Sequence, residues 1–142
     1  MDNIIKFGLF SLGIAAILIG GSMAIFGSNA VVTFFNGLLS LFYNVGEITD
    51  LASPNVDNEL RFYGVMFAFY GLILVQTASD IKKYFARIPL LLTVFALAGL
   101  ARLIGYLFVG KPQMLFIVLM VIEFTLPAIL ILCWYKRKKD TS

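Results

Sequence analysis

Histidine is absent from this sequence of 142 residues, and cysteine occurs once, as Cys133. Without histidine the chain lacks the commonest general base and a frequent ligand of zinc and haem. A single cysteine forms neither an internal disulfide nor a thiolate metal cluster. We therefore expect no catalytic residues, no metal site and no cofactor, and we do not expect the protein to be an enzyme.

Charged residues are also scarce. They make up 13% of the chain, against roughly 25% in a typical soluble domain, whereas 61% of the residues are hydrophobic. A soluble fold of this size buries only about two thirds of the surface of its chain, so much of this apolar surface would face water. The same apolar content excludes intrinsic disorder. The composition therefore predicts an integral membrane protein, and the fourteen Phe side chains suit contact with lipid.

Four apolar runs are long enough to cross a bilayer, which takes roughly 17–25 residues in a helix. They are residues 7–26, 62–78, 88–108 and 114–135. Each is too long for a barrel strand and lacks the alternation of polar and apolar residues that such a strand shows. Because lipid offers no partner to backbone polar groups, helices remain as the spanning structure. We predict one all-α domain over residues 1–142, an integral membrane four-helix bundle.

Basic residues gather at alternate ends of these runs. One side has Lys6, Lys82, Lys83, Arg87 and Lys136–Lys139, and the other has Arg61 and Lys111 together with the acidic residues Glu47, Asp50, Asp57 and Glu59. Because Lys and Arg concentrate on the cytoplasmic side, we predict that both termini are cytoplasmic. The basic tail suits an anchor on anionic lipid, so the net charge of +3 calls for no nucleic acid partner.

The loop between the first two runs contains a helical pattern. Ser28 and Asn29 are good N-cap residues, and they precede apolar residues at helical spacing, namely Val31, Phe34, Phe35, Leu38, Leu41 and Phe42. This spacing predicts an amphipathic helix over about 30–43, on the outer membrane surface or over the bundle. Its role is either a simple cap on the bundle or a lid over a site in the outer leaflet. The composition of residues 47–58 predicts a polar, acidic loop.

Arg102 and Glu123 interrupt the third and fourth runs. An ionisable group inside a bilayer is costly unless it is paired or faces water. From the helix rise, Arg102 lies roughly 9 Å and Glu123 roughly 14 Å from the outer ends of their runs. The short link 109–113 makes these runs antiparallel neighbours, and a long Arg side chain can cover the difference in depth. We therefore predict an ion pair between Arg102 and Glu123.

Glu59 and Arg61 stand at the outer entrance of the second run, at a similar level. With Arg102 and Glu123 they make a set of zero net charge, which a dry polar cluster requires. Tyr63 and Tyr106 are placed to add hydroxyl groups. Pro127 leaves the backbone carbonyl of Glu123 without its helical donor, so we expect a kink there and a further acceptor for an arginine. Small residues at helical spacing in the first three runs favour close helix packing.

Three interpretations of this cluster remain open. It is a structural ion-pair network, or a pocket in which arginines hold a phosphate or carboxylate head group. In the third interpretation, Glu123 carries protons in a small transporter. A general-base role for Glu123 has little support, because no second acid, nucleophile or ligand set lies near it in the sequence.

Several short segments together resemble a known family. They are Glu59-Leu60-Arg61-Phe62-Tyr63-Gly64, Gly99-Leu100-Ala101-Arg102-Leu103, Gly110-Lys111-Pro112, and Glu123 followed by Pro127. This pattern resembles a family of small bacterial four-helix membrane proteins grouped as a domain of unknown function. The resemblance covers nearly the whole chain. It implies a bacterial inner-membrane location and a four-helix unit that stands alone, and it brings no known substrate.

The sequence thus leads to a functional hypothesis. We expect Arg61 and Arg102 to hold the head group of a membrane lipid or of another amphiphilic anion, while Glu59 and Glu123 orient the arginines. Such binding would support lipid organisation in the cell envelope or its permeability barrier. The alternatives are a structural or accessory subunit, which binds a membrane protein or its own copies, and a proton-coupled transporter of small molecules that uses Glu123.

Overall fold

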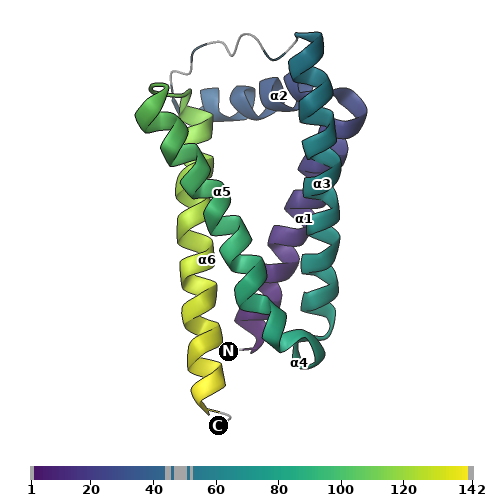
Figure 1. The fold of residues 1–142 in the computed structure, drawn as a ribbon, viewed down its shortest axis with the longest axis vertical. Coiled ribbons are helices and arrows are strands. Elements are labelled where there is room, and N and C mark those ends of the chain that lie inside the picture. The colour runs from purple at the N-terminus through teal and green to yellow at the C-terminus, as the bar shows by residue number, and fades with distance from the viewer. Residues whose placement is uncertain (1, 44–45, 47–50, 52, 141–142) are drawn as a thin grey trace. The chain divides into compact units, whose positions relative to one another are not determined.

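The structure is a computed structural model that describes residues 2–43, 46, 51 and 53–140. Its elements, in chain order, are α1 (Asp2–Phe26), α2 (Ser28–Ser40), α3 (Pro54–Ser79), α4 (Ile81–Tyr84), the 3-10 turn η1 (Phe85–Arg87), α5 (Ile88–Phe108) and α6 (Met114–Asp140). None of the described residues forms a strand. The predicted all-α class is confirmed (Figure 1).

Four helical segments are long and apolar enough to cross a membrane: Asp2–Phe26, Pro54–Ser79, Ile81–Phe108 and Met114–Lys139. The additional helix α2 follows the first of them, as predicted. The boundaries of α5 and the start of α6 agree with the apolar runs in the sequence. The chain is therefore a helical protein built to span a membrane.

Two helices begin earlier than the apolar runs predict, and one ends earlier. α3 begins at Pro54 rather than at residue 62, because proline suits the first position of a helix and polar residues continue it. α1 begins at Asp2. α2 ends at Ser40, whose hydroxyl donates to the Gly37 carbonyl at 2.6 Å, so its last predicted turn lies outside the helix. Of the predicted acidic loop, residues 47–50 and 52 lie outside the described residues.

Close contacts divide the chain into two compact units. The α5–α6 unit comprises residues 1–11 and 74–142, and the α1–α2–α3 unit comprises residues 12–73.

In the α5–α6 unit, helices α5 and α6 run antiparallel, side by side (Figure 1). Its core contains fully buried aliphatic side chains, among them Ile5, Leu9, Leu74, Ile88 and Leu92. At the end that holds both chain termini, an ion pair joins Asp2 to Arg137, and the Trp134 indole donates to the Phe85 carbonyl at 3.0 Å. These contacts tie the start of α1 and the turn η1 to the end of α6.

In the α1–α2–α3 unit, α1 and α3 approach each other closely through glycines. A Cβ atom added at Gly20 would lie 2.6 Å from the Ala68 backbone nitrogen, and one added at Gly71 would lie 2.6 Å from the Gly13 carbonyl oxygen. Only glycine permits this distance between the two backbones, as the small residues in the sequence indicate. After α1 the chain turns at Gly27, which has a φ of 85°, and α2 runs crosswise to α1 and α3 (Figure 1).

This close packing predicts different effects for two neighbouring glycines. Gly20→Ala forces α1 away from the α3 backbone and should destabilise the protein by about 1–3 kcal/mol, the usual cost of overpacking. Gly21→Ala is the matched control, because an added Cβ there has no atom within 4 Å. Thermal unfolding in detergent measures both variants. Equal stability of the two would contradict the glycine-mediated contact.

Candidate functional site

Arg102 and Glu123 form the predicted ion pair within the α5–α6 unit. The Nε atom of Arg102, on α5, donates to both carboxylate oxygens of Glu123, on α6, at 3.1 Å and 2.8 Å. The Glu123 side chain is only 8% exposed, whereas that of Arg102 is 36% exposed. The carboxylate is therefore the buried partner of the pair and the guanidinium the accessible one.

Neighbouring residues make room for the ion pair and contact it. A Cβ atom added at Gly99 would lie 3.0 Å from the Glu123 Cβ atom, so the missing side chain makes room for the acidic residue. Arg102 follows Gly99 by about one helical turn and therefore shares its face. The length of the Arg side chain covers the difference in depth that the helix rise predicts. Arg102 also lies 5.8 Å from the centre of the Phe116 ring, within the range of a cation–π contact.

The N–H groups of Arg102 that do not bind Glu123 determine which ligands the ion pair could hold. Both of its hydrogen bonds to Glu123 use Nε. Its terminal amino groups, Nη1 and Nη2, donate to none of the described residues. Two parallel N–H groups of this kind match the two oxygens of a phosphate or carboxylate. Glu123 thus fixes one edge of a guanidinium and leaves its other edge available to an oxyanion.

Pro127 is fully buried inside α6, and the kink expected there stays a prediction. The hydrogen bonds between Arg102 and Glu123 go to the carboxylate, and the further acceptor expected at the backbone carbonyl is not used by Arg102 among the described residues. Tyr106 lies one turn beyond Arg102 on α5 and is partly exposed. Its hydroxyl forms no hydrogen bond with the described residues.

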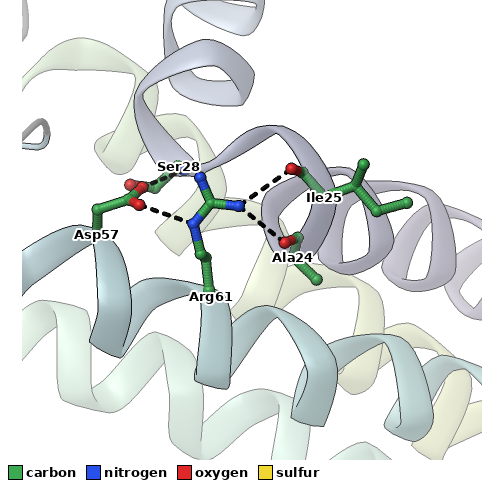
Figure 2. Close-up of polar contacts among 5 residues, drawn as sticks. All are labelled: Ala24, Ile25, Ser28, Asp57 and Arg61. Atoms are coloured by element: carbon green, nitrogen blue, oxygen red, sulfur yellow. Dashed lines mark hydrogen bonds and ion pairs between the residues drawn. The ribbon is translucent and has the colours of Figure 1, made fainter.

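Arg61 lies in the α1–α2–α3 unit and has a different set of partners (Figure 2). Its Nη1 atom donates to the carbonyls of Ala24 and Ile25, at 2.9 Å and 3.0 Å, and its Nε atom donates to Asp57 Oδ2 at 2.7 Å. Carbonyls in the last turn of a helix have no partner within that helix and carry partial negative charge. The guanidinium therefore caps the end of α1.

The other oxygen of Asp57 serves the next helix. It accepts from the Ser28 backbone N–H at 3.4 Å, at the start of α2, where the helix dipole favours negative charge. The turn between the helices passes close by: a Cβ atom added at Gly27 would lie 2.8 Å from both Arg61 Nη2 and Asp57 Oδ1. One ion pair on α3 thus holds the end of α1 and the beginning of α2 together.

Asp57 is the residue that the sequence reasoning missed. Asp57 forms the ion pair with Arg61, and the expectation that Glu59 orients Arg61 stays a prediction. Asp57 precedes Arg61 by four residues, the spacing at which an acidic and a basic residue pair on one helix. That signal was available, but it requires the helix to begin at Pro54 rather than at residue 62.

Glu59 and Tyr63 lie nearby on α3. Glu59 is exposed and has no hydrogen bond or ion pair with the described residues. Tyr63 is exposed, and its ring and that of Phe62 pack edge to face with their centroids 5.6 Å apart. The predicted union of Glu59, Arg61, Arg102 and Glu123 in one cluster stays a prediction, because the two halves of that set belong to separately described units.

The unequal burial of Arg102 and Glu123 leads to a testable asymmetry. Arg102→Ala leaves a buried carboxylate unpaired and should cost about 3–5 kcal/mol of unfolding free energy. Glu123→Ala should cost less, since a long arginine side chain can extend toward water. The double variant should be more stable than Arg102→Ala alone, because no buried charge remains. Unfolding in detergent measures all three. Strictly additive losses would contradict the pairing.

A comparison with known families finds a model that matches nearly the whole chain. The family model described as a domain of unknown function, DUF4345, matches residues 4–135, which include every residue of this candidate site. No curated protein and no solved structure matches the chain. Because the match covers nearly the whole sequence, the resemblance noted in the sequence is confirmed, and the chain belongs to the DUF4345 family, whose function is unknown.

Proposed function

We propose that the protein binds a lipid or other amphiphilic anion through Arg102. The observation that carries this proposal is the orientation of the guanidinium: Glu123 holds its Nε edge, and both terminal amino groups have no partner among the described residues. In a bidentate Arg–carboxylate pair, by contrast, a second N–H group of the guanidinium would also bind the carboxylate.

The surroundings of Arg102 favour an amphiphilic ligand over a soluble one. Many large apolar side chains of α5 and α6 are exposed and so face lipid in a membrane, among them Leu97, Leu107, Phe108 and Val121. A charged head group bound at Arg102 would have its acyl chains beside these side chains. Hydrogen bonds to an ionised oxygen are also stronger in such surroundings than in water, because the dielectric constant is low.

The wider role that we propose is support of lipid organisation in the envelope, or of its permeability barrier, in the bacterial inner membrane. Four helices able to span a membrane support a membrane location. The distribution of Lys and Arg supports cytoplasmic termini. Under this proposal Lys83, between α3 and α5, faces the cytoplasm, and Lys111, between α5 and α6, faces the opposite side.

Cysteine labelling tests this orientation. In a Cys133→Ser background, Lys111→Cys should react in intact cells with a maleimide that does not cross membranes. Lys83→Cys should react only after the cells are made permeable, because the bilayer shields it. Both residues are exposed, so access to the side chain itself is matched. Labelling of Lys83→Cys in intact cells would reverse the proposed topology.

Lipid binding is tested by native mass spectrometry of the detergent-purified protein with added phosphatidylglycerol. Arg102→Lys keeps a cation for Glu123, but a single ammonium cannot also present two parallel donors to a phosphate. We expect this variant to lose phosphatidylglycerol affinity about tenfold, the loss of roughly one charged hydrogen bond. Arg87→Lys is the matched control, because Arg87 donates to the Gln76 side chain and lies over the Tyr84 ring rather than pairing with an acidic residue.

The outcomes separate the proposal from its main alternative. Weaker binding by Arg102→Lys with normal thermal stability supports a head-group site. Equal binding by Arg102→Lys and by the unaltered protein, or no lipid on either, would return Arg102 and Glu123 to a structural role. A protein partner would then become the leading hypothesis.

A further inference from the structure

A second candidate site lies entirely within the α1–α2–α3 unit. It is an open pocket of about 520 Å³ between the end of α1 and the start of α3, lined by Ala24, Asn58, Glu59, Arg61, Phe62 and Val65. Pockets for small ligands commonly measure about 300–1,000 Å³. The volume therefore suits a lipid head group with the first part of its chains.

The pocket lining changes from polar to apolar along α3. Asn58, Glu59 and Arg61 form its polar end, and Phe62 and Val65 follow within about one and a half turns. This change coincides with the start of the apolar run at residue 62. A head group bound at the polar end would therefore lie at the level where the membrane interface begins.

The charges of the pocket do not cancel. The carboxylate of Asp57 neutralises the Arg61 guanidinium at 2.7 Å, and two backbone carbonyls accept from the same guanidinium. Glu59 is left with an exposed carboxylate that has no partner among the described residues. The pocket thus carries one excess negative charge at its mouth, which disfavours a purely anionic ligand and favours a cationic group.

We propose that this pocket binds a zwitterionic phospholipid with a primary ammonium, such as phosphatidylethanolamine. The ammonium would pair with the Glu59 carboxylate, within reach of the exposed Phe62 ring, whose face attracts cations. The phosphate would accept from the Asn58 side-chain amide beside the Arg61 guanidinium. The chains would follow Phe62 and Val65 into the membrane. This proposal concerns the α1–α2–α3 unit alone, and its head group differs from the one proposed at Arg102.

The test compares lipids by native mass spectrometry in an Arg102→Lys background, so that the site proposed at Arg102 contributes little. We expect phosphatidylethanolamine to bind about tenfold more tightly than phosphatidylglycerol or phosphatidylcholine. The first of these competitors lacks an amine, and the second has an ammonium without N–H donors. Phosphoethanolamine without acyl chains should compete weakly. Competition by it at equal strength would overturn the assignment to a lipid.

Two variants address the pocket itself. Glu59→Gln should reduce the preference for phosphatidylethanolamine about tenfold, because it removes the partner of the ammonium, and Val65→Trp should abolish binding by filling the apolar end without changing any charge. Asp80→Asn is the control for Glu59→Gln, since it removes one negative charge at the start of α4, outside the pocket lining, and asparagine also serves as an N-cap. Each variant is first compared with the parent in thermal stability.

The outcomes of the two proposals are distinguishable. Loss of phosphatidylethanolamine in Glu59→Gln, with phosphatidylglycerol binding retained when Arg102 is intact, supports two independent sites. Two results would overturn the proposal for the α1–α2–α3 unit. One is unchanged phosphatidylethanolamine binding in Glu59→Gln. The other is equal binding of phosphatidylethanolamine, phosphatidylglycerol and phosphatidylcholine by the Arg102→Lys protein. Neither of these results bears on Arg102.

Discussion

The structure depends above all on the cost of placing a charge in apolar surroundings, which pairing alone reduces to a tolerable level. Glu123 meets this constraint within α6: its side chain is buried, and the accessible Arg102 supplies its counter-charge from the neighbouring helix. The pairing requires α5 and α6 to be adjacent and in one register. An ion pair between two side chains thereby fixes the relative position and register of two apolar helices.

The same constraint applies to backbone groups at helix ends. The turn from α1 to α2 leaves carbonyls at one end and N–H groups at the other without helical partners. Arg61 and Asp57 supply one charge of each sign, and the sign of each matches the helix end that it meets. A polar pair placed one turn before the apolar part of α3 thus stabilises a corner made by two other helices.

The sequence predicts some of these features well and others poorly, for physical reasons. Hydropathy locates α5 to the residue, because its apolar run and its helix have the same ends. It misplaces the start of α3, since hydropathy follows contact with lipid, whereas backbone hydrogen bonds continue into polar residues such as Asp57. The Arg102–Glu123 pair is predictable because few charges lie inside the spans. The partner of Arg61 is predictable only if the helix is known to begin at Pro54, because several acidic residues lie near Arg61 in the sequence and the spacing of four selects Asp57 only within a helix.

The corner at Gly27 also links the helices mechanically. α2 has exposed apolar side chains, including Phe34 and Leu38, and its first N–H group is bonded to Asp57. Asp57 in turn is bonded to Arg61, which lines the pocket on α3 together with Glu59. A change in the tilt of α2 would have to break this chain of bonds or pull it along. The turn therefore ties the orientation of α2 to the position of a guanidinium that lines a pocket on another helix.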